Sequence, residues 1–386
     1  MYLKKKLKKL IESKKTLLGV GPMSKNCVDA SIEVTDKYNF PIMLIASRRQ
    51  IDANIFGKGY VENWGTEKFS KYVMSKSKKK NIILCRDHGG PYQNNNDIIN
   101  KLTLKDAIKN SKKSFEIDIK NDFKIIHIDP SINLKGNLKK NLIMDNLYEL
   151  MIYCDEISRK NNKKILIEIG TEEQSGTTNT FEEIEKFLND INLFCKKNKI
   201  IKPSFVVLQT GTKVQELENV GSFECPIRIE NEIAPEIQIF KALELCDKYD
   251  FWMKEHNGDY LSDESLKWHP KIGIHATNVA PEFGVIETIS LIKILKEYNM
   301  KKYLNLFLEL SYNSKKWTKW LRKNSNADDF KKSIIAGHYI FSDKEFIELK
   351  KNIIEKLKKK SINLDLYLKQ NIMKSILRYT KCFKLH

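Results

Sequence analysis

An Asp-His pair stands directly after an apolar run in this chain of 386 residues. Residues 82–85 are apolar, Asp87 and His88 follow almost at once, and Gly-Gly-Pro at 89–91 forces a turn. A carboxylate transfers protons and an imidazole binds a metal ion, so the pair suits chemistry next to a carbonyl group. The same pair also occurs in ordinary surface turns. Its meaning therefore depends on what other parts of the chain lie beside it.

The pattern around the pair repeats along the chain. Eight short β-branched runs alternate with helical segments, and we expect strands at residues 16–22, 41–46, 82–85, 124–128, 164–169, 204–208, 251–254 and 270–274. Parallel strands need crossover helices, so the pattern predicts an α/β fold, a (β/α)8 TIM barrel.

Beyond residue 300 the pattern is helical only. We expect residues 1–300 to form the barrel with its catalytic rim and residues 301–386 to form a C-terminal helical extension. A capping box from Ser342 to Glu345 is expected to open one of its helices. The extension is interpreted as a helical layer on the barrel, a dimerisation element or a lid.

Polar and charged residues follow nearly every predicted strand and rarely precede one. In a barrel these strand ends surround one axis at the catalytic rim. The residues expected to converge there are Asp87, His88, Asp129, Glu168, Glu172, Glu173, Gln209, His256, Asp259 and His275. Imidazoles with carboxylates suit a divalent ion, zinc above all, and favour aldol, isomerisation or epimerisation chemistry on a polyhydroxy carbonyl compound.

Each candidate also has a structural interpretation. His127 lies inside a predicted strand and is interpreted as a core histidine or as one that supports the ligands of the site, while His275 is either a ligand or a hydrogen-bonded residue packing the barrel mouth. Glu172 and Glu173 are either solvated loop residues or groups on a loop that swings over a substrate.

Composition narrows the function classes. The net charge is +19, yet only seven of the 68 basic residues are Arg and no basic patch with interleaved aromatic residues is seen, so nucleic acid is not expected as a partner. Seven single cysteines without paired spacing and the lack of a signal peptide or membrane-length apolar run predict a reduced, cytoplasmic protein.

Five short motifs fall on successive predicted strand ends. They are Asp-His-Gly-Gly-Pro at 87–91, Ile-His-Ile-Asp at 126–129, Ile-Gly-Thr-Glu at 169–172, Val-Val-Leu-Gln at 206–209 and Glu-His-Asn-Gly-Asp-Tyr at 255–260. In this order the motifs resemble the GatZ/KbaZ family, over residues 17–340. That family comprises the so-called non-catalytic subunits of class II tagatose-bisphosphate aldolases, and some members are sugar-phosphate 4-epimerases.

The resemblance implies roles for several residues. Asp87 would be the proton-transfer carboxylate, His88 and His256 metal ligands, and Glu168 an acidic residue near the metal. Glu172 or Glu173 would be a second acid, base or ligand. The resemblance also implies that Asp259 contacts the substrate. Apart from the resemblance, we expect substrate contacts from other residues near predicted strand ends, namely Ser47, Arg48, Arg49, Asp129 and Asn278.

The chain also departs from the pattern. Class II aldolases carry a histidine ligand on the sixth strand, where this chain has Gln209, so Gln209, a carboxylate or His275 would have to replace it. Arg48 and Arg49 follow the second strand, and the family's Arg/Tyr-rich run is absent from the tail. We therefore hypothesise that anion recognition has moved to the second strand.

Three functions remain open. The first is a metal-dependent epimerase or aldolase-like enzyme, an isomerase or lyase of carbohydrate metabolism, acting on a sugar phosphate, a nucleotide-linked sugar or another acidic sugar. The second is a stabilising subunit of a class II aldolase, whose catalytic subunit would then be the partner. A nucleic-acid binder ranks last. A homo-oligomer is compatible with each.

Overall fold

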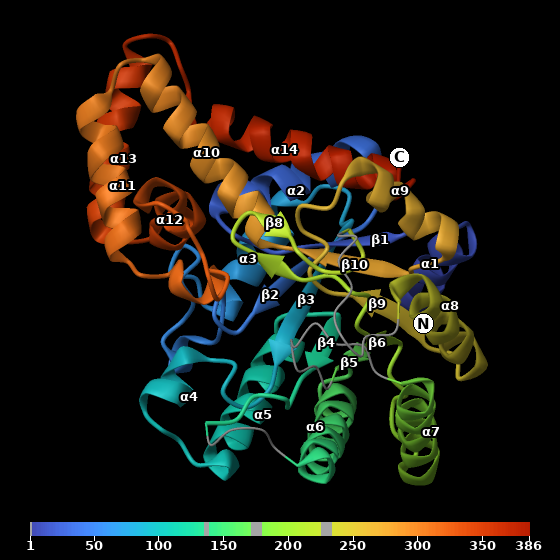
Figure 1. Ribbon diagram of the computed structural model, residues 1–386. Helices are drawn as coiled ribbons and strands as arrows, with labels where there is room; N and C mark the ends of the chain where they lie inside the picture. The colour runs from blue at the N-terminus through green and yellow to red at the C-terminus, as the bar shows by residue number, and fades with distance from the viewer. Residues whose placement is uncertain (1, 135–138, 171–179, 225–233) are drawn as a thin grey trace.

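Eight parallel strands close into a barrel in this computed structural model, which describes residues 2–134, 139–170, 180–224 and 234–386 (Figure 1). The order around the barrel is β1-β10-β9-β6-β5-β4-β3-β2, which confirms the predicted TIM barrel. The barrel strands are β1 (Leu17–Val20), β2 (Ile42–Ser47), β3 (Ile82–Gly89), β4 (Ile125–Ile128), β5 (Leu166–Ile169), β6 (Phe205–Val207), β9 (Trp252–Glu255) and β10 (Ala276–Val279). A short antiparallel hairpin, β7 (Val214–Gln215) with β8 (Glu218–Asn219), follows β6.

Helices precede, connect and extend the barrel. Those up to the last barrel strand are α1 (Tyr2–Glu12), α2 (Lys25–Tyr38), α3 (Thr66–Lys76), α4 (Asn95–Ile99), α5 (Leu104–Lys120), α6 (Lys140–Lys160), α7 (Phe181–Asn198), α8 (Pro235–Lys248) and α9 (Asp263–Ile272). Those after it are α10 (Pro281–Glu297), α11 (Lys301–Asn313), α12 (Asp329–Ala336), α13 (Lys344–Lys358) and α14 (Leu364–Cys382). The extension is thus helical, as expected.

Local signals in the sequence explain where several helices begin. The hydroxyl of Ser24 accepts a hydrogen bond from the Cys27 N–H and caps α2. Thr180 and Glu183 form a capping box at the start of α7. Each cap fixes where the chain turns from a strand end into the following helix.

The predicted eighth strand is wrong. Residues 270–274 are the last turn of α9 and the segment that ends it, because Gly273 adopts a left-handed conformation with φ of +95°. The strand that closes the barrel is β10, and it pairs with β1 and β9. His275 therefore precedes the strand instead of following it.

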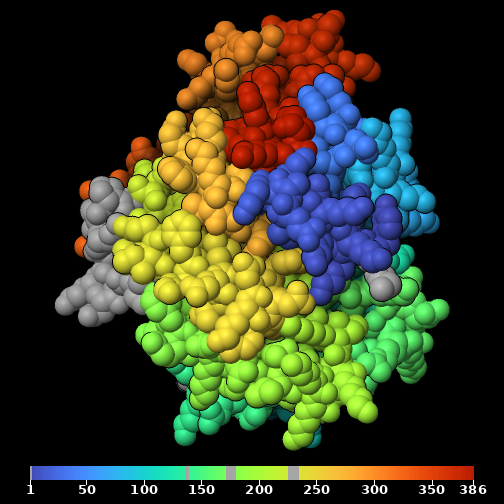
Figure 2. All heavy atoms as spheres, turned by 90° about the vertical axis from the view of Figure 1, so that its right-hand side faces the viewer, coloured from blue at the N-terminus to red at the C-terminus, as the bar shows by residue number. Residues whose placement is uncertain are grey.

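Apolar side chains fill the amino-terminal half of the barrel interior. They come from alternate positions of the strands, and α1 adds the fully buried Leu7. The interior cluster consists of Leu7, Leu17, Met43, Ile45, Ile83, Cys85, Ile125, Phe205, Trp252 and Ala276. α1 thus lies over this end of the barrel, and the functional side chains gather at the other. In Figure 2 the blue N-terminal segment lies against the red C-terminal segment.

The extension returns to the barrel through α14. This helix packs on α2, α9 and α10, and residues such as Ile372, Ile376 and Tyr379 join the main hydrophobic core. Helices α11 and α13 pack around a second core with Phe307 and Phe346 (Figure 1). The division into two domains near residue 300 stays a prediction.

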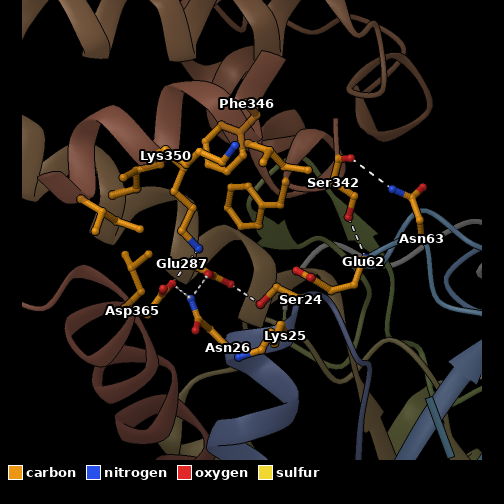
Figure 3. Close-up of a pocket in the computed structure, with 16 residues that line it drawn as sticks. Ser24, Lys25, Asn26, Glu62, Asn63, Glu287, Ser342, Phe346, Lys350 and Asp365 are labelled. Carbon is orange, nitrogen blue, oxygen red and sulfur yellow. Dashed lines mark hydrogen bonds and ion pairs between the residues drawn. The ribbon is translucent and has the colours of Figure 1, made fainter. Parts of the chain in front are cut away.

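A cavity of about 330 Å³ lies at the junction of barrel and extension (Figure 3). The expected capping box at Ser342 is not formed, since α13 has Asp343 as its N-cap without a side-chain cap bond. Ser342 instead joins the two parts of the chain. Its hydroxyl accepts a hydrogen bond from the Glu62 N–H at 2.6 Å, and its carbonyl accepts one from the Asn63 amide at 3.3 Å.

Two further expectations concern cysteines and membranes. Six of the seven cysteines lie in the described residues, and all six are buried free thiols. Within the same residues, no helix combines the length and the apolar character that a bilayer crossing requires.

Candidate active site

Four titratable side chains converge inside the carboxyl end of the barrel. We call Asp87, His127, Glu168 and His256 the rim group. Their ligand atoms all lie within 4.8 Å of one another. Nδ1 of His127 lies 3.7 Å from both Asp87 Oδ1 and Glu168 Oε1, and Nε2 of His256 lies 3.4 Å from Glu168 Oε1. Residues from β3, β4, β5 and the end of β9 therefore meet at one point.

Strand alternation explains why these side chains meet. Successive side chains of a strand point to opposite faces, so residues two apart share a face. Ile125 lies in the barrel interior, and His127 is two residues further along β4. In the same way, Asp87 lies two residues after the interior residue Cys85, and Lys254 and His256 lie two and four residues after the interior residue Trp252. Each of these strands thus places an apolar residue toward the amino-terminal end of the barrel interior and a polar residue near its carboxyl-terminal rim.

His88 lies beside the rim group because β3 is locally irregular. The pairing register of β3 with β4 shifts between Arg86 and Gly89, and His88 has a left-handed φ of +42°. Its ring centroid lies 5.0 Å from that of His256 and 5.3 Å from that of His127. Three imidazoles are therefore neighbours at the rim.

Asp129 fixes the orientation of His88. One carboxylate oxygen lies 2.8 Å from His88 Nδ1 and accepts a second hydrogen bond from the Gln93 amide, also at 2.8 Å. The other oxygen accepts hydrogen bonds from the Ser131 N–H and hydroxyl. With Nδ1 held in this way, Nε2 of His88 lies on the side of Asp87, at 4.0 Å from Oδ2.

A buried ion pair supports the rim group. Nζ of Lys254 lies 2.7 Å from Oε2 of Glu168, and both side chains are fully buried. Burial by itself raises the pKa of Glu168, but the ammonium of Lys254 and the imidazoles of His127 and His256 outweigh it and lower that pKa to about 2. Burial lowers the pKa of Lys254, yet the Glu168 carboxylate outweighs it and the net pKa is raised. Both groups are therefore charged at neutral pH.

The Asp87 carboxylate is ionised too. Burial raises its pKa, but the imidazoles of His88, His127 and His256 outweigh burial and hold the pKa well below the ordinary value. Oδ1 of Asp87 also accepts a hydrogen bond from the Asn278 amide at 3.2 Å. Two anionic carboxylates therefore face two imidazoles of the rim group.

The donor set of the rim group fits a divalent cation. Nδ1 of His127 lies 3.2 Å from the backbone N of His88 and 3.7 Å from an oxygen of each of the two carboxylates. Nε2 of His127 is buried on the opposite side, next to Gly170, without a hydrogen-bond partner among the described residues. Two imidazoles with carboxylates match the ligand types of catalytic zinc. The residues present therefore fit a metal ion.

Some of the predicted site residues lie next to the rim group. Asn278 contacts Asp87, Asp129 contacts His88, and Ser47 pairs with Asp87 in the register of β2 with β3. The Ser47 hydroxyl accepts the N–H of Gln50 in the turn that follows. Gln209 is half-buried just beyond β6. Glu172 and Glu173 lie outside the described residues.

Arg48 and Asp259 face other parts of the protein. The guanidinium of Arg48 is fully buried, with Asp52 at 2.8 Å and Asp97 at 3.1 Å. Oδ1 of Asp259 accepts the N–H groups of Ala280 and Glu282, each at 2.9 Å, at the start of α10. Both predicted substrate contacts are thus engaged in holding loops and helix starts. Arg49, by contrast, is only half-buried.

His275, expected as a metal ligand, is separated from the rim group because it precedes β10. Its Nδ1 accepts a hydrogen bond from the backbone N–H of Met253 at 2.8 Å. Burial lowers the pKa of His275 to about 4, so the ring is neutral at physiological pH. The structure corrects its predicted position at a strand tip.

Two residues of the site were missed in the sequence. The sequence predicts His127 only as a core histidine or one that supports the ligands, and Lys254 only as part of a strand. The signal that identifies both is alternation, since each shares its strand face with residues of the barrel interior. A polar residue at such a position points into the barrel.

No protein-family model matches the chain, and no curated protein matches it in sequence. Solved structures do share its fold. A Sinorhizobium meliloti protein described as a probable tagatose 6 phosphate kinase is 14% identical with a TM-score of 0.69, over 95% of this chain and 100% of its own. A fructuronate-tagaturonate epimerase from Cohnella laeviribosi is 9% identical with a TM-score of 0.57, over 95% and 81%. A fructose-bisphosphate aldolase from Campylobacter jejuni is 13% identical with a TM-score of 0.55, over 99% and 94%. Identities this low show a shared fold.

Proposed function

We propose that this chain is a metal-dependent epimerase with aldolase-like chemistry, acting on a ketose phosphate or a related anionic sugar. The observation that carries the proposal is the rim group, in which two imidazoles and two carboxylates meet at the carboxyl end of a TIM barrel. The proposal agrees with the motifs that resemble the GatZ/KbaZ family and with the named activities of the epimerase and the aldolase that share the fold.

Three members of the rim group would hold the cation. The side chains of His127, Glu168 and His256 are at most 5% exposed, whereas that of Asp87 is 12% exposed. Two histidines and one glutamate form a ligand set used by catalytic zinc, with a position left for substrate. A cation bound there would polarise a carbonyl or hydroxyl oxygen of the sugar.

Asp87 would transfer the proton. It is the rim-group member that solvent reaches most easily, and the Asn278 amide holds one of its oxygens. In a retro-aldol route Asp87 takes the proton of the hydroxyl on the carbon β to the carbonyl. The carbon–carbon bond then breaks, with its electrons moving toward the carbonyl, and the freed aldehyde rotates to present its opposite face. Re-addition inverts the configuration of that carbon, and Asp87 returns the proton to its oxygen. His88, oriented by Asp129, faces the same space.

The first test is elemental analysis of the purified protein, followed by a screen of ketose phosphates, uronates and nucleotide-linked sugars for epimer formation. We expect one divalent ion per chain and turnover of an anionic sugar. Asp87→Asn should lower kcat at least about a hundredfold while metal content stays unchanged. A protein purified without metal that also fails to gain activity with zinc, manganese or cobalt would contradict the proposal.

A second measurement separates the two routes to an epimer. In deuterated water, a deprotonation route places deuterium on the inverted carbon, whereas the retro-aldol route leaves the original hydrogen there. We expect the original hydrogen to be retained, and NMR of the product reads this directly. Exchange at the inverted carbon would replace the retro-aldol step by simple proton transfer.

If the chain is instead a stabilising subunit, these experiments should give the opposite results. A separate class II aldolase should then co-purify with the chain, and the activity of that aldolase should survive Asp87→Asn in the chain. Loss of that stabilisation in Asp87→Asn, together with turnover by the isolated chain, would rule it out.

A further inference from the structure

The extension reaches the loop that follows β2. The two hydrogen bonds at Ser342 tie residues 62 and 63 of this loop to the segment that precedes α13 (Figure 3). Three residues before Ser342, the ring of Tyr339 packs against that of Tyr60, with centroids 4.9 Å apart. Trp320 donates a hydrogen bond from Nε1 to the Tyr339 hydroxyl at 3.1 Å. A seam of aromatic side chains therefore joins the barrel loop to the extension.

Two cations meet at this seam. Arg49 comes from the barrel loop, and its Nε is buried without a hydrogen-bond partner among the described residues. Lys319 comes from the extension, and its Nζ lies 5.5 Å from the centroid of Tyr339 and 4.5 Å from that of Trp320. Arg49 and Lys319 are close enough for their charges to act on each other.

The surroundings of these cations differ from those of Arg48. The Lys319 side chain is exposed, but its amine lies against the rings of Trp320 and Tyr339. The loss of water there, with the like charge of Arg49 adding to it, lowers the pKa of Lys319 to about 8. Arg48 and Arg86 are instead neutralised by buried aspartates. Two like charges held together without a described carboxylate between them favour an anion.

Uncharged donors border the same place. The Tyr260 hydroxyl is buried without a hydrogen-bond partner among the described residues. His338 adds no charge, because burial, with the nearby Lys319 cation, lowers its pKa to about 3. Tyr260 follows His256 of the rim group by four residues, and Arg49 follows Ser47 by two. Arg49 and Tyr260 thus lie on the loops that leave β2 and β9 at the carboxyl end of the barrel, the end that carries the rim group.

We propose that Arg49 and Lys319 form an oxyanion site at the seam between barrel and extension, which binds the phosphate or carboxylate of the sugar. A guanidinium offers a planar fork of donors and an ammonium a compact charge, and the two together suit either oxyanion. This inference rests on the proposed function for the identity of the sugar. The site itself is independent of metal chemistry.

The test is isothermal titration of the full-length protein with two probes, inorganic phosphate and glycolate. We expect one of them to bind with one site per chain. Arg49→Met and Lys319→Met should each raise its Kd at least about tenfold, and Arg49→Lys should recover part of the affinity. Lys323→Met, which removes an exposed cation of the same extension, is the matched control and should bind as the wild type does.

The outcomes are distinct. Phosphate binding indicates a sugar phosphate and glycolate binding an acidic sugar, and either supports the site. Absence of binding for both probes, or equal Kd values in the wild type, Arg49→Met and Lys319→Met, overturns it. In a turnover assay, the same two variants should raise KM for the anionic sugar with little change in kcat. The titration needs no turnover, so it stands even if the proposed function fails.

Discussion

Lys254 and Glu168 form an ion pair inside the barrel, with Nζ 2.7 Å from Oε2 and both side chains 1% exposed. The pair spans from β9 to β5, across β6. Because one oxygen of Glu168 is held by the ammonium, the other is fixed toward His127 and His256. Lys254 thus acts as a positioning residue for a proposed metal ligand.

Replacing Lys254 by Met should destabilise the protein by about 3–5 kcal/mol, because Glu168 then keeps a buried charge without its cation. Urea denaturation measures the loss. The double variant Lys254→Met with Glu168→Gln should recover much of it. Lys241→Met breaks an exposed pair with Glu244 and, as the control, should cost less than about 1 kcal/mol. Equal losses of stability in Lys254→Met and Lys241→Met would show that the buried pair contributes no more than the exposed one.

Histidine substitutions test the proposed ligand set. His127→Gln should lower metal affinity at least about tenfold, because it removes an imidazole that faces two carboxylates. Elemental analysis after dialysis against a weak chelator measures the metal retained. His275→Gln is the matched control, since this ring only accepts a backbone N–H before β10. A protein that loses its metal through His275→Gln but not through His127→Gln would contradict the assignment.

The sequence was sufficient to predict the barrel, because each strand is a short apolar run followed by polar residues. It also indicated Asp87, Glu168 and His256, which lie at or near strand ends. It failed at β10, where the apolar segment before His275 forms the last turn of a helix that Gly273 ends. Apolar runs of this length are compatible with either a helix end or a strand.

Side-chain direction was the harder part of the site. His127 and Lys254 face inward because they share strand parity with residues of the barrel interior, whereas Arg48 and Arg86 have the opposite parity and lie behind the sheet. Lys319 depends on how the extension folds back on the barrel. Such a contact between distant segments has no local signal in the chain.

Arg48 and Arg49 are adjacent in sequence yet should respond in opposite ways. Arg48→Met should cost about 3–5 kcal/mol, because Asp52 and Asp97 would remain buried without their cation. Arg49→Met should change stability by less than about 1 kcal/mol, since no buried carboxylate among the described residues depends on it. Urea denaturation of both variants is the measurement. Similar losses would indicate that Arg49 is structural as well.

Asp259 should make stability depend on pH. Burial, with the nearby Glu282 carboxylate adding to it, raises the pKa of Asp259 to about 8. Between the unfolded value near 4 and this value, the folded state keeps a proton that the unfolded state has lost. The stabilisation that Asp259 contributes is therefore fully present below about pH 4. As pH rises toward 8, the free energy of unfolding falls by at most about 1.4 kcal/mol per pH unit.

Asp259→Asn should flatten this slope. The amide oxygen can still accept the N–H groups of Ala280 and Glu282, so the start of α10 keeps its hydrogen bonds. Urea denaturation at pH 5, 6, 7 and 8 compares the variant with the wild type, and the exposed Glu309→Gln is the control. We expect the gain of Asp259→Asn over the wild type to grow with pH. Parallel stability curves for the two proteins would show that Asp259 does not hold a proton in the folded state.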